Sequence, residues 1–314
     1  MPFKMHSIKL EMGDDMEIKK TKLGMGTFIE IQVVDANPEQ LRQMEISVDR
    51  AFQIFAAVER VCSRFSADSE LSKASRKVGV AVQISPVLFE TLRFALEMSR
   101  LTNGAFDPTI GKTQENIGFN RHYLTGLTIN TPIEAKATFR DIILDEAART
   151  MQLLKPAVID LGAVAKGFAI DMASNELRLF EGFIVNAGGD LYAGGLDESG
   201  SPWKIGIEHP DREGHMLGFV RLSNQALCTS GSYERISPNS PGVHHLINAR
   251  TKRQATQWSS CSIVAPYAMM ADAFSTAAFL LEPQDAEELI NKANLYGVMF
   301  TSDQQIRRIG DGLL

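Results

Sequence analysis

The chain has 314 residues, of which 44% are hydrophobic and 22% charged, a composition typical of a globular protein. Its net charge of −6 provides no basic field for nucleic acid or anionic lipid, so a phosphate-bearing ligand needs a local site. No apolar run approaches the length of a membrane span, and the first twenty residues lack the apolar core of a secretion signal. Three widely spaced cysteines indicate neither a disulfide framework nor a zinc cluster. We therefore expect a cytoplasmic protein without a membrane anchor.

The first half of the chain alternates between strand and helix signals. Apolar residues at every second position predict a half-buried strand over Thr27–Val34, which Asn37-Pro38 ends. Apolar spacing of three and four residues predicts a helix from Glu39 to Val61. Ser85-Pro86 is a typical helix start, and Asn103-Gly104 is a typical helix stop.

The second half predicts a helix over Val164–Phe180, followed mainly by strands and then by two more helices. The apolar stripe of that first helix comprises Ala165, Phe168, Ala169, Met172 and Leu179. The strands are expected over 183–195, 203–209, 218–223 and 259–265, and the helices over about 270–281 and 283–293. This pattern predicts a single α+β domain over 21–314 after an N-terminal extension over 1–20.

The segment VIDLGAVAKGFAIDMA, residues 158–173, places charged side chains among small and aliphatic residues. Burying a charge is costly unless the charge is paired or bound to a ligand. Small residues at 162, 163 and 165 let the backbone approach a ligand, and the following helix N-terminus favours an anion. From the first turn, Lys166 would reach either a phosphate or Asp160, so a purely structural Asp–Lys pair is an equal alternative.

A second candidate segment is MMADAFSTAAF, where Asp272 and Thr276 share one face of a predicted helix. Their oxygens, with adjacent Ser275, are hard donors that suit Mg²⁺. The alternative is an aspartate favoured by the helix dipole and a threonine bonded back to the helix. Elsewhere, Gly188-Gly189 indicates a hairpin, a bulge or a ligand contact, and the pair His244 and His245 includes a candidate general base.

These segments are weak signals individually, but their order along the chain is specific. Together the sequence resembles the FAD:protein FMN transferase family, the ApbE-type flavin transferases. The matching segments are LGMGT (23–27), SRFSADSELS (63–72), TNGAFDPTIG (102–111), DLGAVAKGFAID (160–171), VNAGGDL (185–191), WKIGIEHP (203–210), TSGSYER (229–235), HHLINART (244–251) and ADAFSTA (271–277).

The resemblance implies an α+β fold with a T-fold-like core and mixed, mainly antiparallel sheets packed with helices. It implies a Mg²⁺-dependent transfer of FMN from FAD to a threonine of a target flavoprotein, through a phosphoester bond, with release of AMP. Mn²⁺ is the alternative metal. Some family members instead hydrolyse FAD to FMN and AMP, so an FAD pyrophosphatase is one alternative function. A third is an FAD-binding protein with little turnover.

The resemblance also assigns site residues. The FAD contacts are Met25, Ala105, Phe106, Asp107, Asp160, Lys166 and Leu246. The metal ligands are the carbonyl oxygen of Ala163 with Asp272 and Thr276, and Ser275 as a weaker candidate. The catalytic residues are His245, as the base for the acceptor hydroxyl, and Asp160, which orients the site.

Three segments depart from the family pattern. FSADSE is shorter than is common in the family and lacks its tyrosine and asparagine, so we expect a ring that covers part of the FAD to be missing. INARTK replaces the usual IDPRTG, and Lys112 replaces a proline. The first departure bears on the balance between transfer and hydrolysis.

Overall fold

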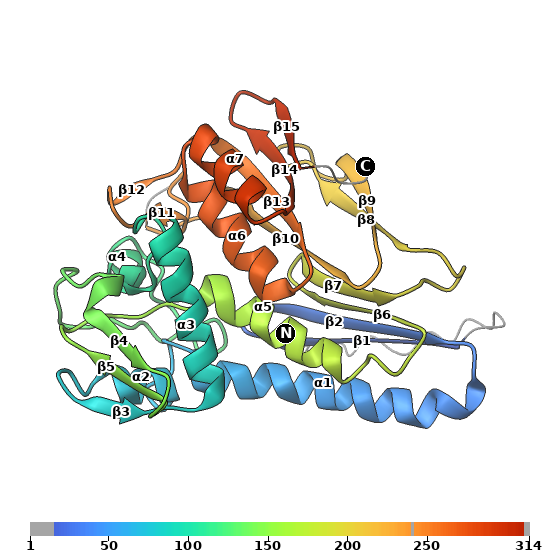
Figure 1. Ribbon diagram of the computed structural model, residues 1–314, viewed down its shortest axis with the longest axis horizontal. Helices are drawn as coiled ribbons and strands as arrows, with labels where there is room; N and C mark the ends of the chain where they lie inside the picture. The colour runs from blue at the N-terminus through green and yellow to red at the C-terminus, as the bar shows by residue number, and fades with distance from the viewer. Residues whose placement is uncertain (1–15, 240–241, 311–314) are drawn as a thin grey trace.

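The computed structural model describes residues 16–239 and 242–310, and its centre is an eight-stranded sheet (Figure 1). Each neighbouring pair of strands in this sheet is antiparallel. In spatial order the strands are β1 (Met16–Gly24), β2 (Thr27–Asp35), β6 (Gly182–Ala187), β7 (Asp190–Gly195), β10 (Gln225–Gly231), β13 (Trp258–Ala265), β14 (Tyr296–Thr301) and β15 (Ile306–Ile309). The N-terminal extension expected over 1–20 lies largely outside the described residues.

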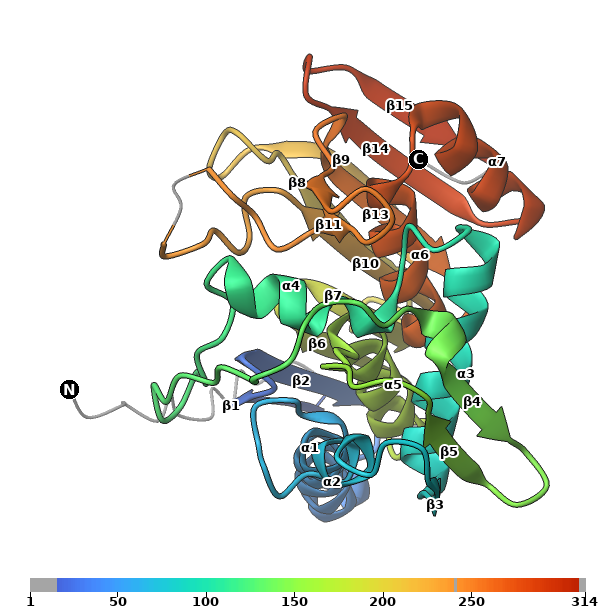
Figure 2. The same cartoon turned by 90° about the vertical axis from the view of Figure 1, so that its left-hand side faces the viewer.

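Helices cover one face of the sheet and a β-hairpin covers the other (Figures 1 and 2). The long helices are α1 (Leu41–Cys62), α3 (Pro86–Leu101), α5 (Gly162–Asn175), α6 (Ala268–Leu280) and α7 (Pro283–Lys292). The hairpin of β8 (Trp203–Glu208) and β9 (Met216–Leu222) packs its apolar side chains on the opposite face. The protein therefore has two hydrophobic cores separated by one sheet.

Smaller elements complete the chain. They are α2 (Glu70–Ser75), α4 (Gly111–Asn116), β3 (Ala81–Gln83), β4 (Ile142–Asp145), β5 (Thr150–Leu153), β11 (Ile247–Asn248), β12 (Arg253–Gln254) and the 3₁₀ turns at Pro38–Gln40, Pro108–Ile110 and Phe139–Asp141. The predicted α+β class with mainly antiparallel sheets is confirmed.

Local sequence signals located several elements correctly. In β2, the predicted apolar face of Ile29, Ile31 and Val33 is buried. Ser85 caps α3 by accepting the Leu88 N–H at 3.3 Å. The segment 183–195 is a hairpin of β6 and β7.

The expectation for α5 was wrong in its bounds and in its buried face. The helix begins at Gly162 and ends at Asn175, so Lys166 lies in its second turn. Met172 and Leu179 of the predicted stripe are exposed. The reason is that α5 is enclosed by α1, α6 and the sheet, so that small residues are buried around most of its circumference.

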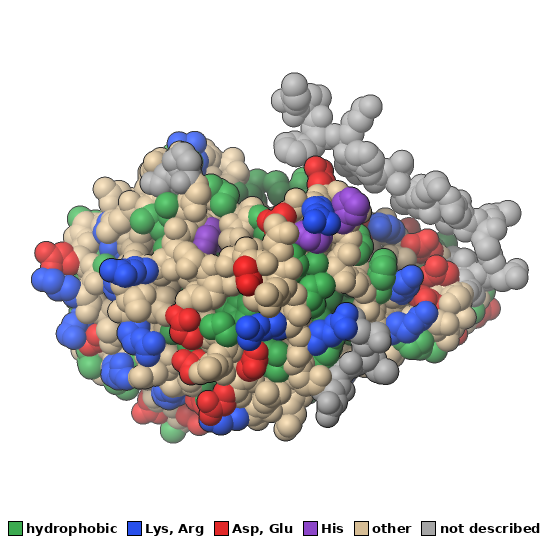
Figure 3. All heavy atoms as spheres, turned by 90° about the horizontal axis from the view of Figure 1, so that it is seen from above, with side chains coloured by type: hydrophobic (Ala, Val, Ile, Leu, Met, Phe, Trp, Pro, Cys, Tyr) green, Lys and Arg blue, Asp and Glu red, His purple; other side chains and the backbone are tan. Residues whose placement is uncertain are grey.

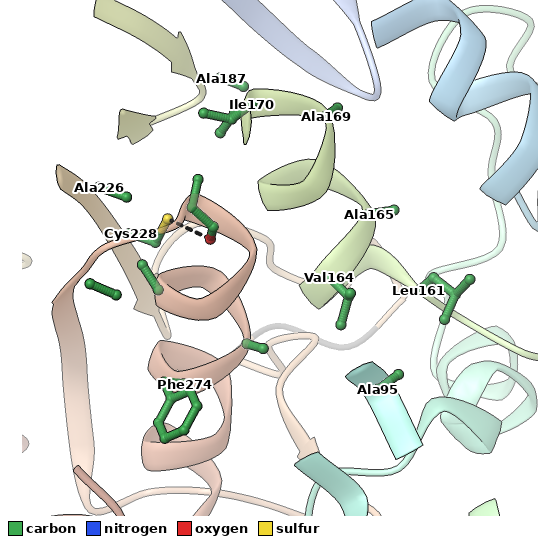
Figure 4. Packing of buried hydrophobic residues seen from close by; sticks show 14 of the residues in the cluster. Ala95, Leu161, Val164, Ala165, Ala169, Ile170, Ala187, Ala226, Cys228 and Phe274 are labelled. Carbon is green, nitrogen blue, oxygen red and sulfur yellow. Dashed lines mark hydrogen bonds between the residues drawn. The ribbon is translucent and has the colours of Figure 1, made fainter. Parts of the chain in front are cut away.

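Helices α5 and α6 cross at close range in the centre of the protein (Figure 4). A Cβ atom added at Gly167 would lie 2.4 Å from the carbonyl oxygen of Ala268, so only glycine fits. Asp171 of α5 accepts the backbone N–H groups of Ala268 and Met269, at 2.6 and 2.9 Å, and so caps α6. In the same place the thiol of Cys228 in β10 donates to the Ala268 carbonyl at 3.5 Å. The two helices therefore have a fixed register.

We predict that Gly167→Ala destabilises the protein by about 1–3 kcal/mol, because the new methyl group meets backbone atoms that cannot rotate away. Thermal unfolding followed by circular dichroism measures the change. Asn175→Ala, at the exposed end of the same helix, is the control and should change the melting temperature little. An equally stable Gly167→Ala protein would show that the crossing is looser than described.

Candidate functional site

A cavity of about 520 Å³ lies where the first turns of α5 meet the side of α6 and the loops around them. Its volume is within the range of small-molecule sites in proteins. Segments that are far apart in sequence form its walls, including the turn between β1 and β2 and the loop that follows β10. Of the residues predicted for the site, those that line the cavity are Met25, Phe106, Asp107, Asp160, Ala163, Lys166, His245, Leu246, Asp272 and Thr276. Ala105 and Ser275 do not line it.

Asp160 is held by a cation from another part of the chain. The Nε group of Arg64 donates to its Oδ2 atom, and the Gly162 N–H donates to Oδ1 at 2.7 Å. Burial raises the pKa of Asp160, but the charge of Arg64 and the Gly162 hydrogen bond outweigh it, so the pKa falls below its usual value. Asp160 is therefore an ionised carboxylate at neutral pH.

Lys166 pairs with Asp190, not with Asp160, which corrects the structural alternative drawn from the sequence. Asp190, at the start of β7, is buried and also accepts the Thr229 N–H from β10 at 2.9 Å. The ammonium group of Lys166 is thus fixed at the cavity wall by a carboxylate that the sheet holds in place.

Asp272 and Thr276 lie on the face of α6 that points to the cavity. The Gly167 N–H donates to the Asp272 carboxylate at 3.2 Å, which ties it to α5. Asp272 is only 5% exposed, and burial raises its pKa although nearby Lys166 opposes the shift. Ser275 points elsewhere, because its hydroxyl donates to the Asp272 carbonyl oxygen at 2.9 Å.

The donors around Asp272 fit a hard divalent cation. No group of three or more His, Cys, Asp or Glu side chains within 16–239 and 242–310 is arranged to hold a metal ion. The metal ligands expected from the sequence do not form such a group. They are one carboxylate, one hydroxyl and one backbone carbonyl, from Asp272, Thr276 and Ala163, which all line the cavity. Such oxygen donors suit Mg²⁺, which keeps water or phosphate oxygens in its remaining positions. A buried carboxylate whose nearest lysine is already paired also favours an added cation.

The two adjacent histidines have different surroundings. His244 is buried; its ring accepts the Leu246 N–H at 3.2 Å and lies 3.1 Å from the Ala255 carbonyl. His245 lines the cavity, and its Nδ1 atom is buried without a hydrogen-bond partner in the described part of the chain. Burial, and then the charge of Arg235, lower the pKa of His245 to about 3. Its imidazole is therefore neutral at neutral pH.

Three other predicted FAD contacts have backbone or side-chain groups that hold the chain around the cavity. Asp107 accepts the Thr109 N–H at 2.8 Å and the Phe139 N–H at 2.9 Å, so its carboxylate is occupied in closing a turn. Ala105 is completely buried, and its carbonyl accepts the Ala249 N–H at 2.9 Å. Met25 has a φ of 51° in the turn between β1 and β2, where its N–H donates to Glu59 at 3.2 Å.

The family's tyrosine is absent from the shortened FSADSE segment, so the missing ring over part of the FAD stays a prediction, although other rings line the cavity. Phe65, from that segment, lines the cavity and packs edge-on against His122, with 6.4 Å between the ring centroids. Phe106, Phe119 and Tyr123 line it too. His122 stacks on Tyr123 at 5.2 Å. One part of the cavity is therefore walled by rings that suit a planar heterocycle.

Sequence reasoning missed several charged residues of the cavity, and those within segments already matched to the family are Arg64, Asp190, Glu234 and Arg235. For these four residues the signal was present, because they lie in the segments SRFSADSELS, VNAGGDL and TSGSYER. In total six carboxylates and four basic side chains line the cavity. The cavity thus carries more negative than positive groups before any ligand binds.

The surface outside the cavity has mixed charge. Figure 3 shows acidic and basic side chains interspersed over one face of the protein. None of the helices in the described residues is long and apolar enough to cross a membrane.

Comparison with known proteins identifies the class. A sequence model described as the ApbE family matches residues 25–300. The chain is 30% identical to the FAD:protein FMN transferase of Treponema pallidum, with 84% of this chain and 79% of that protein covered. It is 29% identical to the enzyme of the same name from Haemophilus influenzae, covering 77% and 74%. The crystal structure of the ApbE protein from Thermotoga maritima superposes with a TM-score of 0.81 at 25% identity, covering 94% and 97%.

These relatives are enzymes, and both curated ones are named for the transfer of FMN from FAD to protein. The chain belongs to the ApbE family. The family resemblance and the fold predicted from the sequence are thereby confirmed.

We predict that the ring signals of His245 do not shift in an NMR titration from pH 7.5 to 5, because the folded pKa is about 3. In the unfolded chain a histidine titrates near 6.5, so below that pH the unfolded state binds more protons and the folded state loses stability as the pH falls toward 3. Loss of the signals in His245→Gln assigns them, and the protein in urea is the control. A midpoint near 6.5 in the folded protein would contradict the burial argument.

Proposed function

We propose that the protein transfers FMN from FAD to a threonine of a target flavoprotein, with Mg²⁺ as the metal, and releases AMP. The observation that carries this proposal is that Asp160, Lys166 and Asp272 line one cavity although they come from different elements. The names of the curated relatives support the transfer of FMN to protein.

The charges of the cavity support a diphosphate ligand that binds together with a cation. Lys166 offers a positive charge near the start of α5, where backbone N–H groups also favour an anion. Asp190 and Asp272 nearby would repel a diphosphate that binds alone. A divalent cation removes this conflict, so the proposal requires FAD and metal to bind together.

Asp272, Thr276 and the Ala163 carbonyl would hold the metal. When bound, Mg²⁺ neutralises charge on the diphosphate and makes its phosphorus more electrophilic. Ser275 is omitted from this set, because its hydroxyl is engaged with the Asp272 carbonyl.

His245 would remove the proton from the acceptor. The threonine oxygen forms a bond to the phosphorus of the FMN half, the bond from that phosphorus to the bridging oxygen breaks, and AMP leaves with that oxygen. The proton from the threonine hydroxyl passes to Nδ1 of His245, which has no hydrogen-bond partner in the part of the chain that the structure describes. A phosphate beside the ring raises the pKa of the imidazole, because a negative charge favours the protonated form. The ligand itself would thus make His245 a better base.

The acceptor is a protein, and its threonine must enter the cavity beside His245. The cytoplasmic location stays a prediction from the sequence.

We predict that the protein, incubated with FAD, Mg²⁺ and an acceptor flavoprotein fragment, gives AMP and a flavin-fluorescent acceptor band on a denaturing gel. Chromatography quantifies AMP and free FMN in the same sample. Replacing the acceptor threonine with valine should abolish the band. AMP with free FMN and no band would instead identify a pyrophosphatase, and FAD binding without either product a binding protein.

We predict that Asp272→Asn lowers AMP release by roughly 10²-fold, because the metal loses its only carboxylate. It should also remove the dependence of FAD affinity on Mg²⁺, measured by quenching of flavin fluorescence. Asp211→Asn, an exposed carboxylate, is the matched control. Wild-type turnover by Asp272→Asn, or full activity of wild type in EDTA, would refute this metal site.

A further inference from the structure

We infer that Arg64 is a further binding residue of this cavity, whose unpaired Nη1 group donates to a hydrogen-bond acceptor on the edge of a planar heterocycle. This inference rests on the proposed function, since FAD carries two such heterocycles, the flavin and the adenine. Arg64 is not among the residues that the sequence predicted for the FAD site.

The guanidinium of Arg64 is buried and fixed from two directions. Its side chain is only 6% exposed. Nε donates to Asp160, and Nη2 donates to the Phe119 carbonyl at 2.6 Å and approaches the Gln114 amide oxygen at 3.5 Å. These contacts hold the plane of the group, because a guanidinium presents its donors in a rigid fork.

The third guanidinium nitrogen of Arg64, Nη1, differs from the other two. Nη1 of Arg64 is buried without a hydrogen-bond partner among residues 16–239 and 242–310. An unsatisfied donor on a charged group costs free energy, and such groups are rare in folded proteins. The Nδ1 atom of His245, which lines the same cavity, is the second side-chain nitrogen left in this state. Two such nitrogens at one cavity indicate donors and acceptors reserved for a ligand.

The surroundings indicate the part of the ligand that Arg64 meets. Phe65 lies directly beneath its guanidinium, with 4.1 Å from Cζ to the ring centroid, and Phe119 supplies the next wall. The Phe119 ring packs against His245 at 6.1 Å. Aromatic walls favour a flat ring, whereas the phosphates are expected at Lys166 and Asp272. Arg64 is therefore suited to the edge of a base and not to the diphosphate.

The ion pair between Arg64 and Asp160 affects which ligands Arg64 favours. Asp160 neutralises the charge of Arg64, so the free N–H acts as a directional donor more than as a general attractor of anions. A base that presents oxygen or ring nitrogen acceptors to this edge gains a hydrogen bond, and a ring without them leaves Nη1 unsatisfied. We expect Arg64 to influence affinity and orientation, with little influence on the chemical step.

The test is Arg64→Lys. This change keeps a cation beside Asp160 but removes the additional guanidinium nitrogens, including Nη1. Isothermal titration with Mg²⁺ compares FAD, FMN and AMP on wild type and variant. Loss of a hydrogen bond from a charged donor should weaken FAD binding about tenfold or more. The half-ligand that carries the contacted base, either FMN or AMP, should weaken similarly while the other changes little. KM for FAD should rise more than kcat falls.

Arg93→Lys, which changes an exposed arginine of α3, is the matched control, and the melting temperature without ligand reports on folding. Unchanged FAD affinity in Arg64→Lys would overturn the inference, and so would equal losses for FMN and AMP with a lowered melting temperature, which indicate a structural role alone. If wild type itself fails to bind FAD, the proposed function fails. If wild type binds FAD and Arg64→Lys binds it equally well, only the inference about Arg64 is refuted.

Discussion

The crossing of α5 and α6 at Gly167 is the constraint on which the rest of the site depends. A single hydrogen in place of a side chain lets the two helices touch through their backbones. Asp171 then caps α6, and the Gly167 N–H reaches Asp272. These contacts fix where α6 begins and where the carboxylate of Asp272 lies. The geometry proposed for the metal therefore follows from helix packing, and the loops around it supply the remaining walls.

The three charges of the segment 158–173 each have a separate partner. Asp160 is bound by Arg64, Lys166 by Asp190, and Asp171 by the N-terminus of α6. The cost of burying each charge is thus met by a different part of the fold: the end of α1, the sheet and a helix end. The segment works as a connector that joins these parts around one cavity. This explains how a run of small residues can carry three charges and remain stable.

Local structure was predictable from the sequence, whereas long-range pairing was not. Caps, turns and periodicity located β2, α3 and the hairpin 183–195, because these signals act within a few residues. They failed for α5, since enclosure on several sides removes the amphipathic stripe. The assignment of site residues came from the family resemblance. Nothing in the spacing of Asp160 and Lys166, six residues apart, revealed that their partners lie 96 and 24 positions away.

The excess of carboxylates in the cavity makes the roles of Lys166, Asp272 and His245 depend on what is bound there. Lys166 is paired already, so an incoming phosphate must compete with Asp190 for it, and a bare anion gains little. The cation proposed at Asp272 would change this, because it would offset the excess of carboxylates and add positive charge beside the phosphate. In the proposed complex, the same phosphate would raise the pKa of His245, which burial lowers in the free protein. In the proposed function, the metal and the nucleotide therefore bind together, because each offsets charges of the cavity that oppose the other.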